Sequence, residues 1–523
     1  MTRIDILKKL KGPHPENLDF LYIEISQNEK IKVYPNSINR LENVVFFIGK
    51  VGNEKSLYAF DETGKSDLVQ HFQNEKSISS EGLTEATLSQ FPLSHENASA
   101  LQSLFAFARP VLIGIDDSIG LGDRLGLANP GHVRAIRGSH MKPVLAQQSI
   151  RELARTEREP EEVMDTAIWA VFQEGYKDGF GADADHLKTT DDIDRLVNAG
   201  FTMFTFDPGD HVVNEADELS LTTLEDRARE VQFAFLNGDF EALVKRYAGQ
   251  DIQLTKTFKL KPDRVAVLRA LVKYGGVIEH TSKMYRHLKR QHPGHAAEVE
   301  LSVDETDAVT TPFEHFFVAS ELKRQGVELV SLAPRFVGQF EKGIDYIGDL
   351  EYFKEEYLKH LAIAERLGPY KISIHSGSDK FDVYAAIGSL RTGHVHVKTA
   401  GTSYLEALKT IAATEPDLFR EILDFSRARF EVEKRTYHVS AKTENVPAAS
   451  ECSDTQLLAL FEQNDARQVL HVTFGKVLTT RGEGGSYLFR DRILACLQEH
   501  EELHYHNLEH HLGKHVRPFA AAK

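Results

Sequence analysis

The sequence predicts an α/β protein built around a (β/α)₈ TIM-like barrel, and two observations carry that prediction. From Pro110 onward the chain repeats a short apolar or alternating run, a polar turn and a helical stretch, which is typical of parallel βα units. Eight runs read as strands, which favours a closed barrel over an open doubly wound sheet. The predicted strands begin at Val111, Phe180, Phe201, Gly275, Val299, Val327, Lys371 and His394.

Two of these runs carry a polar face that reaches their carboxyl ends. In KISIH, Ser373 and His375 alternate with isoleucines, and in HVHVK, His394, His396 and Lys398 alternate with valines. Barrel enzymes build their sites from side chains at the carboxyl ends of the strands. We therefore expect His375 and Lys398 at the mouth of the barrel.

Sequence patterns divide the chain into three parts. Residues 1–109 read as a mixed α/β region, and residues 110–412 read as the barrel. A polar, mostly helical insertion at 212–269 is longer than an ordinary βα loop, and we interpret it as part of a lid. Residues 413–523 read as a mainly helical C-terminal region.

Charge and composition favour a small substrate over a macromolecular partner. The net charge of −16 argues against nucleic acid or an anionic membrane surface as the principal partner, and a hydrophobic content of 41% supports a large core. The N-terminus lacks the apolar stretch of a signal peptide, and no run approaches the about 18 apolar residues of a membrane span. We therefore expect a cytoplasmic protein. Cys452 and Cys496 are too few for a disulfide scaffold, and nothing indicates the oligomeric state.

The segment GADADHLK combines groups that bind metals or move protons. Asp183 and Asp185 share one face of a predicted strand, and His186 and Lys188 follow at its end. A structural reading stays open beside this one, because residues 190–192 can cap the helix that follows.

The segment EVELSVDET places three carboxylates on one face. Glu298, Glu300 and Asp304 alternate with apolar residues, and a carboxylate inside a barrel is costly unless it is paired or bound to a metal. Glu300 is therefore a candidate for proton transfer. Glu314 is different, since it stands three residues after Thr311 with a proline between them, which is the spacing of a capping box and indicates a structural role.

Two loops are able to cover the barrel mouth. The loop after the sixth predicted strand holds Arg335, Glu341 and Lys342, although taken alone Glu341 has the pattern of a solvated surface carboxylate. After His375, the turn at 376–380 offers small residues, backbone N–H groups and Lys380, which together suit an anionic group.

A competing motif lies near the C-terminus. Residues 500–504 read HEELH, a literal H-E-x-x-H zinc-protease motif, and His510 falls where a third histidine would stand. However, Asn507 replaces the expected glycine, and no methionine follows Met284 to form the Met-turn. A zinc metalloprotease is therefore the less favoured reading.

Five segments in one order resemble the tagaturonate epimerase family. They are SIGLGDRLG, GADADHLK, HSGSDKF, HVKTAGTSYLEAL and HLGKHVRPF. The resemblance extends from about Ile113 to Phe519. It implies a barrel-type, metal-dependent isomerase that interconverts D-tagaturonate and D-fructuronate in bacterial hexuronate catabolism.

The resemblance also implies roles for particular residues. It implies one divalent metal held by two histidines and a glutamate, which map onto His186, His375 and Glu341. Glu300 is assigned to proton transfer and Asp183 to the opposing acid/base role. Glu300 and Glu341 compete for the roles of metal ligand and proton-transfer group. Asp183 and its neighbour Asp185 compete for the opposing acid/base role. Candidates for the substrate carboxylate are Lys188, Lys398, Arg335 and Lys380.

The chemistry that the resemblance implies is not a simple enolisation. The inverted carbinol lies one carbon beyond the position adjacent to the ketone, so enolisation at that adjacent carbon would not invert it. Our hypothesis is retro-aldol cleavage followed by re-addition to the other face of the aldehyde, with a divalent cation stabilising the enediolate. Zn, Mn, Fe, Co and Ni all suit a site of two histidines and a carboxylate.

Two other functions stay open at this point. A metal-dependent sugar-phosphate aldolase or isomerase can use the same barrel, with the 376–380 turn holding a phosphate. A non-enzymatic sugar-acid binding protein is disfavoured because several acid/base candidates fall at strand ends.

Overall fold

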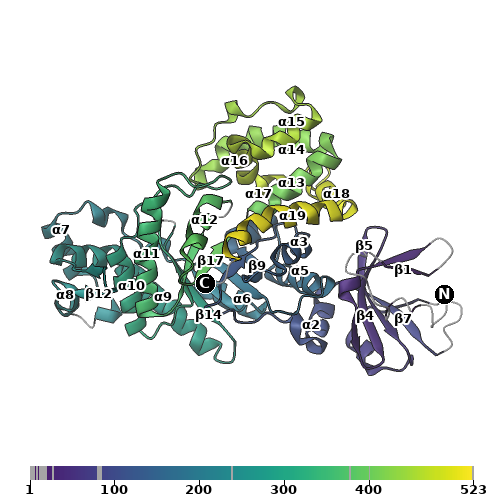
Figure 1. Ribbon diagram of the computed structural model, residues 1–523, viewed down its shortest axis with the longest axis horizontal. Helices are drawn as coiled ribbons and strands as arrows, with labels where there is room; N and C mark the ends of the chain where they lie inside the picture. Colours follow the sequence, from purple (N-terminus) through teal and green to yellow (C-terminus); the bar gives the residue numbers. More distant parts are fainter. Residues whose placement is uncertain are drawn as a thin grey trace.

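The computed structural model describes residues 6, 10, 21–25, 29–78, 85–236, 239–304, 306–375, 379–399 and 401–520. In Figure 1 an N-terminal sheet lies on one side of a central barrel, with a helical insertion on the other side and the C-terminal helices above. Within the described residues, no helix is long and apolar enough to cross a membrane.

The N-terminal part is an antiparallel sheet that is buried on both faces. In β4, Val44, Phe46 and Ile48 pack into the main core, whereas Val45 and Phe47 pack into a separate core on the opposite face. Burial on both sides explains why this strand is an unbroken apolar run. The strands of this sheet are β1 (Leu21–Glu24), β2 (Lys30–Val33), β3 (Asn39–Leu41), β4 (Val44–Val51), β5 (Glu54–Asp61), β6 (Lys76–Ile78) and β7 (Thr87–Pro92), and α2 (His95–Leu104) follows them.

The predicted fold class is confirmed, because eight parallel strands among the described residues close into a barrel. They stand around the barrel in chain order, and the last strand pairs with the first. The barrel strands are β8 (Ser118–Gly120), β9 (Lys142–Ser149), β10 (Gly181–Leu187), β11 (Met203–Phe206), β14 (Glu298–Ser302), β15 (Ser331–Ala333), β16 (Lys371–His375) and β17 (Val395–Lys398).

Two of the eight predicted strands were wrong. The run at Val111 is not a strand, and the first barrel strand is β8, a few residues later. The run at Gly275 lies inside α9 (Arg264–Gln291), where apolar residues at helical spacing face the core. Prediction missed two strands, β8 and β9. The sequence of β9, KPVLAQQS, begins with a lysine and a proline and carries two glutamines into the barrel region. The total of eight was therefore right because two false strands offset two missed ones.

Helices alternate with the strands and form the outer layer of the barrel. The predicted capping box at Thr311 is confirmed, since Glu314 and Thr311 each satisfy the other's backbone N–H at the start of α10. The helices between barrel strands are α3 (Asn129–Ile136), α4 (Ile150–Thr156), α5 (Pro160–Gln173), α6 (Thr190–Asn198), α9, α10 (Pro312–Arg324), α11 (Leu350–Leu367) and α12 (Phe381–Leu390), and α13 (Thr402–Thr414) follows β17.

The segment between β11 and α9 forms the insertion on the outer side of the barrel (Figure 1). It contains α7 (Leu221–Glu230), α8 (Phe240–Tyr247) and a small antiparallel pair, β12 (Ile252–Gln253) with β13 (Lys259–Leu260). The long helix α9 packs against α7, α8 and α10, so it joins the insertion to the barrel wall.

The C-terminal part is helical and has its own core. Residues of α13 and the following helices form a second apolar cluster, while Leu508 and Leu512 of the last helix join the main core beside the barrel. The helices after α13 are α14 (Pro416–Glu433), α15 (Asp454–Ala459), α16 (Asn464–Val472), α17 (Phe474–Thr479), α18 (Arg490–Glu499) and α19 (Glu501–Val516).

Candidate active site

A lysine at the barrel axis binds three carboxylates. Lys398 Nζ lies 2.8 Å from Asp183, 2.7 Å from Asp185 and 2.9 Å from Glu300, and it donates a hydrogen bond of 2.7 Å to Thr205. All five side chains are buried. Three anions around one buried cation raise the pKa of Lys398 well above its ordinary value despite burial, so the lysine is charged.

The three carboxylates around Lys398 differ in their affinity for a proton. Burial raises the pKa of Asp183 to about 6, against the opposing effect of Lys398. Burial acts in the same direction on Asp185 and Glu300, but Lys398 and the nearby histidines outweigh it and hold the pKa of both carboxyls below the ordinary range. Asp183 is therefore the carboxylate of the three that most readily holds a proton near neutral pH.

Two histidines and a carboxylate converge beside this network. His186, His375 and Asp304 each present a ligand atom, and the three atoms lie within 4.8 Å of one another. The two imidazole rings meet edge to face with centroids 5.1 Å apart. Burial lowers the pKa of His186, but Asp185 and Asp207 outweigh that effect and raise it to about 10. The same carboxylates that stabilise a proton on His186 would also stabilise a metal cation at this place.

The backbone at His186 explains how both neighbouring side chains reach the mouth. Strict alternation would turn His186 away from the barrel if Asp185 points inward. The pairing of β10 with β11 shifts register between Ala184 and Leu187, and His186 adopts a left-handed conformation with φ of +53°. A bulge of this kind re-aims a side chain, and strained backbone of this kind is concentrated at functional sites.

The donor set fits a divalent metal. One ring nitrogen of each histidine is held by a carboxylate: His186 Nδ1 lies 3.2 Å from Asp207, and His375 Nε2 lies 2.6 Å from Glu300. Carboxylates hold metal-binding histidines in the same way, which fixes the tautomer of the ring. The other ring nitrogens face Asp185 at 3.7 Å and Asp304 at 3.4 Å. His186, His375 and Asp304 are thus the residues suited to hold the ion.

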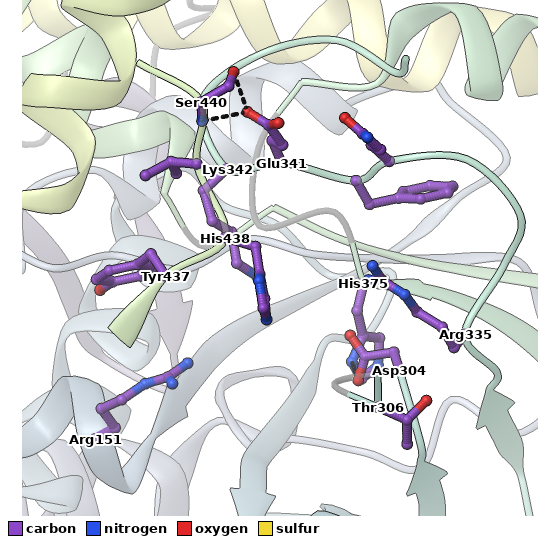
Figure 2. Close-up of a pocket in the computed structure, with 13 residues that line it drawn as sticks. Arg151, Asp304, Thr306, Arg335, Glu341, Lys342, His375, Tyr437, His438 and Ser440 are labelled. Carbon is purple, nitrogen blue, oxygen red and sulfur yellow. Dashed lines mark hydrogen bonds and ion pairs between the residues drawn. The ribbon is translucent and has the colours of Figure 1, made fainter. Parts of the chain in front are cut away.

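A cavity of about 530 Å³, which we call the mouth cavity, opens above this cluster. Figure 2 shows Asp304 and Arg335 beside His375 on one side, with Arg151 and Tyr437 on the opposite side. A smaller inner cavity adjoins it through shared lining residues and reaches Asp185, His186 and Lys398. The cations that line the mouth cavity, Arg151, Arg335 and Lys342, suit an anionic ligand.

The structure brings together some of the predicted metal ligands but not Glu341. The Glu341 carboxylate accepts hydrogen bonds from the backbone and hydroxyl of Ser440 and from Gln468, at 2.7–2.8 Å. Figure 2 shows Glu341 turned toward Ser440, whereas Asp304 lies beside His375. Among the described residues, Asp304 rather than Glu341 is grouped with the two histidines.

The predicted contacts for the substrate carboxylate are similarly divided. Arg335 lines the mouth cavity and Lys398 lines the inner one. Lys188 instead makes an exposed ion pair of 2.9 Å with Asp210. Lys380 is buried and donates to the backbone carbonyls of Glu341 and Ile344, so it fixes the loop beside the cavity, and burial lowers its pKa to about 7. Of the proposed anion cradle at 376–380, residues 376–378 lie outside the described residues.

Sequence reasoning gave no site role to three residues that line the mouth cavity, Arg151, Tyr437 and His438. Arg151 follows β9, a strand that was not predicted, so nothing placed it at a strand end. Lys342, in contrast, lies in the loop that was expected over the barrel mouth, and it does line the cavity. Tyr437 and His438 come from the C-terminal part, between α14 and α15, and a local pattern cannot reveal a residue that arrives from so far along the chain.

The HEELH motif does not form a metal site among the described residues. Glu501 bonds Tyr34 at 2.7 Å and pairs with Lys32, Lys50 and Lys55 at 3.0–3.3 Å. These partners lie on the N-terminal part of the chain, so Glu501 ties α19 to the N-terminal sheet. The motif is structural, and the zinc-protease reading is wrong.

Fold and site together define a barrel enzyme with buried acid/base groups and a cationic cavity for a small polar substrate. The sequence matches the family described as UxaE: tagaturonate epimerase over residues 34–519. The chain belongs to this tagaturonate epimerase family and is accordingly an isomerase of the carbohydrate epimerase class.

Individual relatives agree with this assignment. A protein from Thermotoga maritima named tagaturonate/fructuronate epimerase is 40% identical over 490 residues, which cover 93% of this chain and 96% of the relative. A glycerol-complexed crystal structure of fructuronate-tagaturonate epimerase UxaE from Cohnella laeviribosi is 39% identical, with a TM-score of 0.87, and covers 94% of this chain and 96% of that one. The native structure of the same enzyme is 40% identical, with a TM-score of 0.86, over 94% and 96% of the two chains.

Proposed function

We propose that this chain is a metal-dependent epimerase that interconverts D-tagaturonate and D-fructuronate in the cytoplasm. The observation that carries the proposal is the convergence of His186, His375 and Asp304 beside the Lys398 network, under a cavity lined by cations. The names of the relatives give the substrates, and a uronate matches this cavity in charge.

His186, His375 and Asp304 are our proposed metal ligands, and Asp304 replaces Glu341 in that role. A bound divalent cation would supply a Lewis acid for an oxyanion formed next to the ketone. The chain's own contribution is to orient the imidazoles through Asp207 and Glu300, at 3.2 and 2.6 Å.

Proton transfer remains assigned to Asp183, with Asp185 in place of Glu300 as the group that meets the substrate. Asp183 and Glu300 are fully buried, whereas Asp185 and Lys398 line the inner cavity. We propose that Asp183 exchanges its proton with Asp185 through the shared Lys398 ammonium, which lies within 2.8 Å of both carboxylates. Asp185 then meets the substrate hydroxyl, and Glu300 stays ionised to hold His375 and Lys398.

The proposed reaction is retro-aldol cleavage and re-addition. A carboxylate takes the proton of the carbinol hydroxyl, the bond from that carbon to the carbon beside the ketone breaks, and an aldehyde and an enediolate form. The aldehyde turns, the enediolate carbon attacks its other face, and the new alkoxide takes the proton back. Enclosure within the cavity keeps the two halves together, which a cleavage mechanism requires.

Incubation of the purified protein with D-tagaturonate tests the proposal directly. We expect D-fructuronate to appear by ¹H NMR, loss of turnover after chelation, and recovery with a divalent metal. Full activity in chelator would refute the metal role, and turnover of ketose phosphates without turnover of uronates would favour the aldolase or isomerase alternative. In D₂O, retro-aldol chemistry leaves no deuterium at the inverted carbon, whereas deprotonation at that carbon would incorporate it.

We also propose the three-part division of the chain at 1–109, 110–412 and 413–523. Within it, Tyr437 and His438 of the third part line the cavity of the second. We infer that the C-terminal part completes the substrate site, which a barrel fragment alone would lack.

A further inference from the structure

A second group of metal-ligand side chains lies away from both cavities of the active site. Asp379 stands just before α12, and His511 and His515 stand on α19. Each of the three presents one ligand atom within 4.8 Å of the other two, and all three side chains are buried. The two histidines belong to HLGKHVRPF, a segment with no role in the proposed reaction.

The geometry of this group, which we call the α19 cluster, suits a tetrahedral cation. His511 and His515 are four residues apart on one helix and therefore face the same side. Their Nε2 atoms lie 2.8 and 3.2 Å from the same oxygen of Asp379. Ligand atoms at about 2.1 Å from a tetrahedral zinc ion are about 3.4 Å apart, so small shifts would accommodate an ion.

The α19 cluster also has the outer contacts that metal-binding histidines use. The other ring nitrogen of His511 lies 3.0 Å from Glu406 Oε1 on α13. Asp379 accepts hydrogen bonds from Thr402 at one oxygen and from Arg467 at the other. A carboxylate that contacts the second ring nitrogen of a histidine orients that ring, and hydrogen-bond donors to a carboxylate orient its oxygens. Both kinds of contact would hold the ligand atoms in place.

One histidine of the cluster lacks hydrogen-bond partners. His515 is fully buried, and neither of its ring nitrogens makes a regular hydrogen bond, although Nε2 lies 3.2 Å from an oxygen of Asp379. The rings of Phe381 and Tyr384 flank it, with centroids at 5.0 and 5.3 Å. Glu406 Oε2 is also buried without a partner. A buried polar group without a regular hydrogen bond is destabilising, and a metal ligand bond would satisfy His515.

We propose that Asp379, His511 and His515 bind a second divalent cation of the zinc class. The ion would fasten α19 to Asp379, just before α12, and so hold the C-terminal helix on the barrel. A cavity of about 150 Å³ lined by Asp379, Glu406 and His511 gives access and leaves room for a water as the fourth ligand. The inference does not depend on which sugar the barrel site accepts.

The rival reading is a metal-free ion network. In that case His511 is an imidazolium between Asp379 and Glu406, with Arg467 as a second cation. That reading gives His511 a role but leaves both ring nitrogens of His515 without hydrogen bonds. Metal content distinguishes the two readings.

The test measures bound metal in the full-length protein. Each protein is loaded with zinc, dialysed against metal-free buffer and analysed by plasma mass spectrometry. We expect His515→Gln to hold one ion fewer per chain than the wild type, and Asp304→Asn to lose a different ion. The matched control is His510→Gln, since His510 is the exposed neighbour of His511 and should keep the wild-type content.

Thermal unfolding and spectroscopy supply independent readouts. Zinc should raise the Tm of Asp304→Asn through the α19 cluster, and adding His515→Gln to that variant should abolish the shift. Cobalt in the Asp304→Asn protein should give the visible absorption of a tetrahedral site. Equal metal content in His515→Gln, His510→Gln and wild type would overturn the proposal. If His515→Gln fails to fold, the absence of any cobalt spectrum or zinc-dependent Tm shift in Asp304→Asn would overturn it equally.

Discussion

The ammonium nitrogen of Lys398 lies 2.8 Å from a carboxylate oxygen of Asp183, and both side chains are excluded from solvent at the barrel axis. Asp185 and Glu300 complete the shell around the same ammonium. A lysine held in this way is a fixed internal counter-charge. It is therefore poorly placed to serve mainly as a contact for the substrate carboxylate, which is the role that the family resemblance implied for it.

Removal of this counter-charge should destabilise the protein. Lys398→Met leaves three buried carboxylates facing one another, and breaking a buried ion pair typically costs about 3–5 kcal/mol. We expect the urea midpoint to fall, and the double variant with Asp183→Asn to regain part of the loss because one of the facing charges is gone. An unchanged midpoint combined with a raised KM would show instead that Lys398 is chiefly a substrate contact.

Separate replacement of Asp304 and Glu341 by their amides distinguishes a metal ligand from a residue that holds the loop. Asp304→Asn should lose the active-site metal and the activity, whereas Glu341→Gln should keep the metal, since Glu341 bonds Ser440 and Gln468. Asp207→Asn should lower the metal affinity by about 10–100-fold, because Asp207 only orients His186. Titration with a fluorescent zinc chelator measures all three. Loss of metal in Glu341→Gln alone would restore the original assignment.

Most of the barrel was predictable because its strands show alternating or continuous apolar runs in the sequence. The site was predictable only where its residues follow that alternation. Inward alternation on β14, β16 and β17 correctly grouped Glu300, His375 and Lys398. His186 reaches the same place through a bulge that alternation does not reveal. Asp304 was placed on the inward face by the same alternation, and it lies with the two histidines. Glu341 instead bonds a C-terminal residue, a contact that depends on tertiary folding and leaves no local pattern.

Substitution of Arg151 tests whether the mouth cavity recognises the substrate carboxylate. Arg151 lines both cavities, and a hydrogen bond to a charged group contributes about 1.5–3 kcal/mol, so Arg151→Met should raise KM by about 10–100-fold with little effect on kcat. Lys188→Met is the matched control, because Lys188 pairs with Asp210 in the open. Steady-state kinetics with tagaturonate decide the matter. A larger increase in KM for Lys188→Met than for Arg151→Met would indicate that Lys188, not Arg151, binds the substrate carboxylate.

The pH dependence of stability tests the structural role of Glu501. Burial raises the pKa of Glu501, but Lys55, Tyr34 and Lys50 outweigh it and lower the pKa from 4.5 to about 2. A folded-state pKa below the unfolded value stabilises the fold above pH 4.5, and the contribution disappears as the pH falls toward 2. At neutral pH the contribution is at most about 3 kcal/mol. Burial lowers the pKa of Lys50 and Lys55 even beside this carboxylate. The cost of burying these two cations offsets part of the stabilisation that Glu501 provides.

Glu501→Gln should therefore be less stable than the wild type at neutral pH, and the difference should shrink as the pH falls from 4.5 toward 2. Urea unfolding at several pH values measures the difference in the free energy of unfolding. Glu499→Gln is the control, because Glu499 is exposed at the end of α18 and should behave as the wild type does. A difference that stays constant over this range would mean that Glu501 stabilises the contact between α19 and the N-terminal sheet by packing rather than by charge.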